Sequence, residues 1–246
     1  MKITTGVLLA TILTFTFTHK NPDIRKKTFG VVETSANQTG AWEVLFDGKD
    51  LSKWRKAAVD SVPSKGWIIE KGTLSTLKGR LGGDIITRKT YSSFELECEF
   101  NLTKAANSGI KYLVNPIKNS KTGKFSPMGI EYQIIDDKNY PEVMGDPDGV
   151  SSTGSAYLLY APKGKKLLPA GQWNKVRIVV KGKHTEHWLN GVKVTEYERG
   201  SEDFNKKVAT TKFKDFPEYA KSDKGHIMLT DHGDQVYYKN IKIREL

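Results

Sequence analysis

The sequence is poor in the residues and motifs that mark many common protein classes. Its single cysteine, Cys98, excludes an intramolecular disulfide framework and any metal cluster built from several cysteines. No HExxH, Walker A, GxSxG or Rossmann glycine motif is present. The 22 glycines and 9 prolines follow no triplet repeat, which excludes a collagen-like structure. A hydrophobic content of 37% and an aromatic content of 10% are enough to build a core, so global disorder is also excluded.

The charge is strongly basic but not concentrated in one place. The chain carries 39 lysines and arginines against 28 acidic residues, a formal net charge of +11. Such an excess is compatible with nucleic acid, anionic lipid or acidic glycan partners. Because there is no long basic run and no nucleic-acid-binding motif, we interpret the excess as a solvated surface and expect no nucleic acid partner.

The N-terminus has the pattern of an export signal. A short basic start at Lys2 is followed by an uncharged, mostly apolar run that ends before Lys20. The run is short for a membrane span and fits a secretory signal, with an uncleaved anchor as the alternative. We therefore expect a signal peptide at 1–18, a polar linker at 19–40 and one domain at 41–246. The predicted location is the bacterial periplasm or the exterior, with no integral membrane segment after signal removal.

The rest of the chain is dominated by strand patterns. Residues 94–102 alternate strictly between apolar and polar side chains, and Asn190-Gly191 between two strand-like runs is a strong hairpin signal. No long segment has a helical apolar stripe, and 204–220 is the best place for a short helix or an irregular excursion. About twelve short strands predict an all-β fold, an antiparallel β-sandwich or jelly roll. The other expected strands are 43–46, 67–74, 85–87, 110–114, 129–135, 157–160, 173–180, 184–189, 192–197, 227–229 and 236–244.

The stretch Gly129-Ile-Glu-Tyr-Gln-Ile-Ile-Asp136 is the most informative for chemistry. On a strand, Glu131 and Gln133 point to the same side, about 7 Å apart. A carboxylate beside an amide can bind sugar hydroxyls, hold a metal or move a proton. Asp136 and its neighbour Asp137 follow the strand and are suited to a turn, with a role in the site as the alternative.

Two histidine-containing stretches are further candidates. Asp231-His232-Gly233-Asp234 combines carboxylates, an imidazole and a glycine turn, which suits a base or metal ligand but also an ordinary turn. His187 lies three residues after His184, so on one strand they face opposite sides and cannot share a metal. A single strand histidine such as His187 is more often a core or surface group than a catalyst. Asn107 and Ser108 open another strand and either bind hydroxyls or cap a turn.

Glu95, Glu97 and Glu99 form a ladder of carboxylates on one strand face. Laminarinase-like β-sandwich glycosidases place acidic residues at alternate strand positions, and a retaining pair needs carboxyl groups about 5–5.5 Å apart. Here a glutamate stands where those enzymes have a middle aspartate. We therefore favour a solvated sheet face and keep a direct retaining glycosidase as an alternative.

Taken in order, seven short blocks resemble one family. The resemblance is to the 3-keto-disaccharide hydrolase family and covers about Ala41 to Leu246. The blocks are Leu45-Phe-Asp-Gly-Lys-Asp-Leu-Ser-Lys-Trp54 with Trp67, Asn107-Ser-Gly-Ile-Lys-Tyr112, Gly129 to Asp136, Trp173-Asn174, His187-Trp-Leu-Asn-Gly191, Asp231-His-Gly-Asp234 and Asn240-Ile-Lys-Ile-Arg244.

This resemblance implies a concanavalin A-like jelly roll in an exported bacterial glycosidase-type hydrolase. The substrates would be glycosides or oligosaccharides whose 3-hydroxyl is oxidised to a ketone, and a sugar 3-dehydrogenase that makes the ketone would be a functional partner. The sequence departs from the family at Thr230, where a glutamine is expected, and in a loop rich in proline and aspartate at 140–152.

The chemistry of such a substrate defines what its site must contain. A C3 ketone acidifies the C2 hydrogen, so a base can remove it, an enolate forms, the C1 substituent leaves and water adds. We predict His232 or Glu131 as the base, with His187 as the third catalytic candidate. A divalent metal ion held by Glu131, His187 or His232, or failing that Lys111, would stabilise the enolate.

The remaining candidates would bind the substrate, and two other functions stay open. Gln133, Asn107, Lys111, Asp231 and Asp136 are the predicted substrate-binding residues. One alternative is the direct glycosidase that uses the glutamate ladder. The other is a noncatalytic carbohydrate-binding module with exposed aromatic residues, for which the candidates are Trp54, Trp67 and Trp188.

Overall fold

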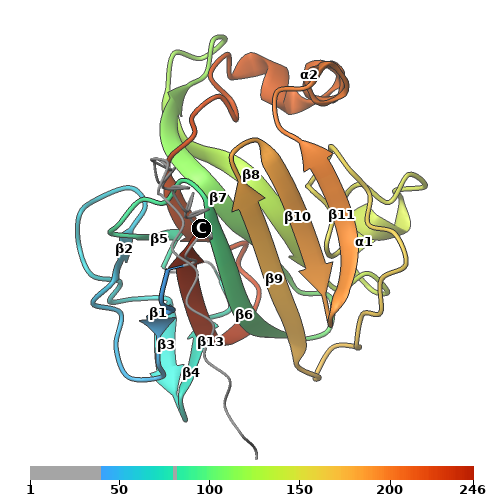
Figure 1. The fold of residues 1–246 in the computed structure, drawn as a ribbon. Helices are drawn as coiled ribbons and strands as arrows, with labels where there is room; N and C mark the ends of the chain where they lie inside the picture. The colour runs from blue at the N-terminus through green and yellow to red at the C-terminus, as the bar shows by residue number, and fades with distance from the viewer. Residues whose placement is uncertain (1–39, 80–81) are drawn as a thin grey trace, which may run out of the picture. The chain divides into compact units, whose positions relative to one another are not determined.

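The computed structural model describes residues 40–79 and 82–246. The expected signal peptide at 1–18 and nearly all of the expected linker, 19–39, lie outside these residues. The described chain forms two antiparallel β-sheets with few helices, so the predicted all-β sandwich is confirmed (Figure 1). No helix in the described part of the chain is both long and apolar enough to cross a membrane.

The larger sheet has eight strands and contains both the first and the last strand described. Its path runs β11-β10-β9-β6-β13-β4-β3, and β1 pairs with β13 beside that path. These strands are β1 (Glu43–Phe46), β3 (Trp67–Glu70), β4 (Thr73–Thr76), β6 (Phe94–Leu102), β9 (Asn174–Lys181), β10 (His184–Leu189), β11 (Val192–Glu198) and β13 (Val236–Glu245).

The smaller sheet has five strands in the order β2-β5-β12-β7-β8. They are β2 (Trp54–Lys56), β5 (Ile85–Thr87), β7 (Asn107–Lys118), β8 (Phe125–Ile135) and β12 (His226–Leu229). The longest pairing joins β7 to β8, with Lys111 opposite Glu131 and Gly109 opposite Gln133. This pairing places the residues of two separate sequence motifs on one sheet face.

Alternation along the strands builds the core between the sheets. Phe94, Leu96, Cys98 and Phe100 point inward and are fully or almost fully buried, as expected from the pattern of β6. The same holds for Ile130, Tyr132 and Ile134 of β8. The residues between them on β8 therefore face outward, away from the core.

Two of the aromatic residues expected to be exposed are in fact buried. Trp54 is inaccessible to solvent and donates its indole N–H to the Leu45 carbonyl, 2.9 Å away. Trp67 is 5% exposed and donates to the Gly83 carbonyl. Both rings pack in the core, which removes them from any carbohydrate-binding surface, and Trp188 remains half-buried.

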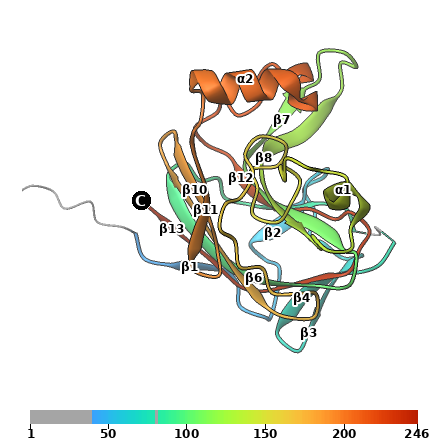
Figure 2. The ribbon, with the colours of Figure 1, turned by 90° about the vertical axis from the view of Figure 1, so that its right-hand side faces the viewer.

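The segment between β11 and β12 is the largest departure from strand structure. It contains the helix α2 (Glu202–Thr210) and the 3-10 turn η1 (Lys212–Asp215), in agreement with the excursion expected at 204–220. The Ser201 side chain caps α2 by accepting from the Phe204 amide. Figure 2 shows α2 at the top of the sandwich. A second short helix, α1 (Pro141–Met144), was not predicted.

Three strand predictions differ from the structure in detail. The run 67–74 is a hairpin whose turn contains Lys71 and Gly72, both at positive φ. Residues 157–160 form a turn with one isolated bridge. In β13 a bulge near Asn240, at φ +52°, shifts the alternation, so Val236, Tyr238, Ile241 and Ile243 are all buried. Strict period-2 counting cannot anticipate that shift.

Candidate active site

Glu131 lies on the outer face of the five-stranded sheet, yet its side chain is buried. The residue is 7% exposed, and its Oε1 atom has no hydrogen-bond partner among the described residues. The Lys111 ammonium lies 3.7 Å from Oε2. A buried carboxylate oxygen without a partner is costly for folding, so its presence points to a ligand or a reacting group.

The position of Glu131 depends on a glycine on the neighbouring strand. A Cβ atom at Gly109 would lie 2.2 Å from Oε1 of Glu131 and 3.0 Å from its carboxyl carbon. The carboxylate therefore leans over Gly109 and occupies the space that a side chain would fill. Gly109 is in the Asn107-Ser-Gly stretch, but the sequence alone did not show its role, because the contact is between strands.

Two amides lie next to Glu131 on the same face. Gln133 is 2% exposed and donates from Nε2 to the Asn107 side-chain oxygen at 3.3 Å. The backbone amide of Asn107 in turn donates to Asp234 Oδ2 at 2.9 Å. The predicted substrate-binding residues Asn107, Gln133 and Lys111 are therefore brought together with Glu131 on β7 and β8.

The Asp231–Asp234 loop follows β12 at the Asn107 end of this face. Asp231 is 1% exposed and accepts from the backbone amides of Gly83 and Gly233, both at 3.0 Å. Its carboxylate thus organises two loops rather than facing a ligand. His232 is exposed. The loop reaches the site through Asp234, which the sequence motif contained but which was not among the selected residues.

Asp136 follows the last residue of β8, and its carboxylate oxygens are hydrogen-bonded within the adjoining turns. Its Oδ2 accepts from the Ala105 amide at 2.8 Å and from the Asn139 side chain at 2.7 Å, and Oδ1 accepts from the Lys138 amide. These bonds match the turn that its position suggested. The structure gives it no contact with Glu131.

His187 does not share a site with Glu131, which corrects its predicted catalytic and metal-binding roles. Its ring lies between the two sheets, inaccessible to solvent, with the ring of Tyr132 4.8 Å away. Glu131 and Tyr132 are consecutive on a strand and point to opposite faces. Both His187 nitrogens are engaged, Nε2 with the Tyr112 hydroxyl at 2.8 Å and Nδ1 with the Gly154 carbonyl at 3.1 Å. Burial lowers the pKa of His187 to about 4.

The predicted metal ligands therefore do not fit a single ion. Glu131, His187 and His232 are divided between the outer face, the core and an exposed loop. In residues 40–79 and 82–246, three ligand-type groups come close together at His184, Glu186 and Glu196 on the larger sheet. The Lys193 ammonium lies 3.2 Å from Glu186 and 2.7 Å from Glu196, so a cation already balances those carboxylates.

A cavity of about 280 Å³ opens beside Glu131 and Lys111. Tyr157 reaches it because its amide donates to the Glu131 carbonyl along the free edge of β8. The other walls include Met128 and the η1 region. Sequence reasoning missed Tyr157 and the η1 residues, which come from irregular segments without a periodic pattern.

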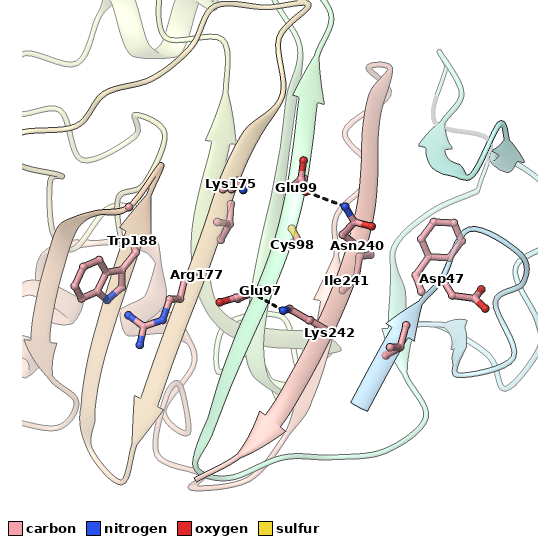
Figure 3. A pocket seen from close by; sticks show the side chains of 14 residues that line it. Asp47, Glu97, Cys98, Glu99, Lys175, Arg177, Trp188, Asn240, Ile241 and Lys242 are labelled. Atoms are coloured by element: carbon pink, nitrogen blue, oxygen red, sulfur yellow. Dashed lines mark hydrogen bonds and ion pairs between the residues drawn. The ribbon is translucent and has the colours of Figure 1, made fainter. Parts of the chain in front are cut away.

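The glutamate ladder lies on the outer face of the other sheet and is neutralised by cations. Glu97 pairs with Lys242 at 2.9 Å, and Glu99 accepts from Asn240 at 2.8 Å (Figure 3). Glu95 is bound by Arg177 and Arg244. Burial opposes ionisation of Glu95, but these two hydrogen bonds outweigh it and lower its pKa. Because a general acid needs a raised pKa, Glu95 does not suit that role. The lysine partners of Glu97 and Glu99 are those of a structural sheet surface.

The outer face of this all-β sandwich gathers a carboxylate, an ammonium and two amides, which together can bind a polar ligand and transfer a proton, as in an enzyme active site. The chain belongs to the 3-keto-alpha-glucoside-1,2-lyase-like domain family, whose model matches residues 41–244. It is therefore an enzyme of the hydrolase–lyase type, and the predicted family is confirmed.

Known relatives agree with this membership. The chain is 31% identical over 225 residues to a 3-keto-disaccharide hydrolase of Bacteroides thetaiotaomicron, covering 82% of this chain and 77% of the relative. A crystal structure from Parabacteroides distasonis, described as a "putative glycosyl hydrolase", has a TM-score of 0.72 and 34% identity over 84% of this chain and 94% of its own. A second structure from that organism with the same description has a TM-score of 0.61 and 29% identity, covering 84% of this chain and 100% of its own.

Proposed function

We propose that the chain cleaves the glycosidic bond of 3-keto-glycosides by elimination and hydration, with Glu131 as the base. The observation that carries this proposal is the buried Glu131 carboxylate, with Lys111 3.7 Å from one oxygen and no described residue bonded to the other. His232, the other predicted base, is exposed and belongs to a loop. The relatives' names supply the substrate class.

The proposed reaction proceeds in two stages. Glu131 takes the proton from C2, the electrons of the C–H bond form an enolate with the C3 ketone, and the C1–oxygen bond then breaks. The proton on Glu131 passes to the departing oxygen and restores the carboxylate. Water then adds at C1, and C2 regains a proton. Lys111 stabilises the enolate oxygen through its positive charge in a partly buried site.

The amide groups bind the sugar ring in this proposal. Asn107 and Gln133 hydrogen-bond to each other, so both orientations are fixed before substrate arrives. Their remaining donors and acceptors suit sugar hydroxyls. His232 lies at the same end of the face and is assigned to contacts with the sugar.

Isotope exchange at C2 tests the proposal directly. A 3-keto-glucoside and the matching plain glucoside are incubated with the protein in D₂O, with and without chelator. We expect turnover of the keto sugar alone, with deuterium at C2 of the product, and loss of both in Glu131→Gln. Cleavage of the plain glucoside, or product without deuterium, would overturn the mechanism. Loss of turnover on chelation would show that a divalent metal ion takes part.

We also propose that the protein is exported and works after a sugar 3-dehydrogenase. The support is the uncharged apolar run within residues 1–18 and the need for a ketone that this chain does not make. N-terminal sequencing of the protein from the periplasmic and secreted fractions checks export. An intact N-terminus in the cytoplasm would contradict it.

A further inference from the structure

On the outer face of β7 and β8, polar amide side chains lie on one side of Glu131 and a cavity lies on the other. Toward one end lie the two amides, with Gln133 two residues from Glu131, or about 7 Å along the strand. Toward the other end lies the 280 Å³ cavity. A hydroxyl-rich ring matches the amide end, so the cavity is left for the group attached at C1.

The cavity has both apolar and charged walls. The apolar and aromatic side chains that line it are Met128, Tyr157, Phe213 and Phe216. Tyr157 is fixed from outside by a hydrogen bond from its hydroxyl to Glu142 at 2.7 Å. Since about 150 Å³ is enough for a benzene ring in a protein cavity, this space accommodates one ring-sized group.

The charges in the cavity do not balance once the internal ion pairs are formed. Glu131 is matched by Lys111. Asp215 is matched by Lys121, with their atoms 3.0 Å apart. Lys212 has its ammonium 4.8 Å from the centre of the Tyr157 ring, and it makes no ion pair with another described residue. One cation beside an aromatic wall is therefore available to a ligand.

The turn that carries Lys212 is held firmly against the site. The amide and hydroxyl of Ser120, at the β7–β8 hairpin, donate to the Asp215 carbonyl at 2.8 and 3.0 Å. Phe213 stacks on Tyr219 with ring centres 4.2 Å apart. These contacts hold the backbone of Lys212 in place, while its side chain is exposed to solvent.

We propose that Lys212 is a specificity-determining residue that selects substrates whose leaving group carries a negative charge. The leaving group lies with its apolar surface against Tyr157 and Phe216, and its carboxylate or sulfate meets the Lys212 ammonium. This inference rests on the proposed function, because it assigns the cavity to the group that departs from C1.

Matched substrates test the inference. The 3-keto derivatives of phenyl glucoside and 4-carboxyphenyl glucoside differ in one charge. For an exposed ion pair we expect the native protein to favour the charged substrate by about fivefold in kcat/KM, with the preference falling as salt rises. Lys212→Met should remove the preference, because kcat/KM for the charged substrate falls to that for the neutral one. A second pair, with a glucose or a glucuronate leaving sugar, distinguishes an aryl carboxylate from a sugar carboxylate.

The control variant is Lys214→Met, because Lys214 belongs to the same turn but does not line this cavity. It should keep the full preference. Equal rates for the two aryl substrates, or a preference that survives in Lys212→Met, would overturn the inference.

A binding measurement separates this inference from the proposed reaction. Benzoate and benzyl alcohol are titrated into the native protein and Lys212→Met. Benzoate binding that depends on Lys212 supports an anion subsite even where no keto sugar is turned over, in which case only the proposed reaction fails. Absence of benzoate binding to the native protein counts against the subsite.

Discussion

The two outer faces of the sandwich both present glutamates beside lysines, but the glutamates differ in burial and in how fully their oxygens are satisfied. On β6, Glu97 and Glu99 face solvent, and each lies within 4 Å of a lysine ammonium. On β8, Glu131 is 7% exposed, Lys111 lies 3.7 Å from one oxygen, and the other oxygen leans over Gly109 with no partner among the described residues. The first arrangement stabilises a sheet surface, whereas the second costs stability and must be maintained for another reason.

The difference indicates what would separate the proposed catalytic carboxylate, Glu131, from the structural ones on β6. Strand alternation places both sets on an outer face, so periodicity alone cannot distinguish them. The distinguishing features are Tyr157 and the segment 212–216, which line the cavity beside Glu131, and the carboxylate oxygen that no described residue satisfies.

Neutralising Glu131 should have the largest effect on activity. Glu131→Gln keeps the shape of the side chain but cannot accept the C2 proton. We expect kcat on a 3-keto-glycoside to fall by about 10²- to 10⁴-fold, the usual contribution of a general base. The thermal midpoint should not fall, because the native carboxylate is already poorly satisfied. Steady-state kinetics and a thermal melt measure both, and full activity would remove Glu131 from the mechanism.

The next test moves the carboxylate without changing its chemistry. In Gly109→Ala the new Cβ occupies the space of Oε1, so Glu131 must shift. A displacement of about 1 Å is expected to lower kcat up to 10²-fold. The matched control is Gly145→Ala, whose Cβ would meet nothing closer than the Pro141 carbonyl at 3.6 Å. Equal kinetics in the two variants would show that the position of Glu131 is not critical.

Much of this site was predictable from sequence because it lies on regular strands. Alternation in 129–136 placed Glu131 and Gln133 on one face, and the Asn107 stretch supplied the partner strand. The prediction that His187 belongs to the site was wrong. His187 lies two residues before Leu189 on the same strand face, and both side chains are buried in the core. Lys212 and Tyr157 were missed, because they reach the cavity from irregular segments whose path depends on contacts such as that of Ser120 with Asp215.

The strand β10 carries one histidine on each face, His184 on the outer face and His187 in the core. Hydrogen bonding to Glu198 raises the pKa of His184 on the outer face, and burial lowers that of His187 to about 4. An unfolded histidine takes up its proton near pH 6.5. The stability that neutral His187 contributes is therefore complete above pH 6.5 and is lost as pH falls toward 4.

We expect this loss to approach about 3 kcal/mol for His187. Denaturant unfolding between pH 7 and 4 measures it, and NMR titration assigns the two histidines. In His187→Gln the protein should be less stable at pH 7 but should lose less on acidification, provided that it folds. If the pH dependence of stability is unchanged in that variant, or if His187 titrates near pH 6.5 in the native protein, the His187 ring is not excluded from solvent.

The smallest effect is expected on the outer face of the larger sheet. Glu97→Gln removes a charge whose Lys242 partner is 38% exposed, so the ion pair contributes at most about 1 kcal/mol and is screened by salt. Activity on a 3-keto-glycoside should match that of the native protein, and the unfolding midpoint should move little. A large fall in kcat would return the glutamate ladder to the mechanism. An unchanged kcat beside an inactive Glu131→Gln would show that burial with one unsatisfied oxygen, rather than carboxylate spacing, marks the reactive face.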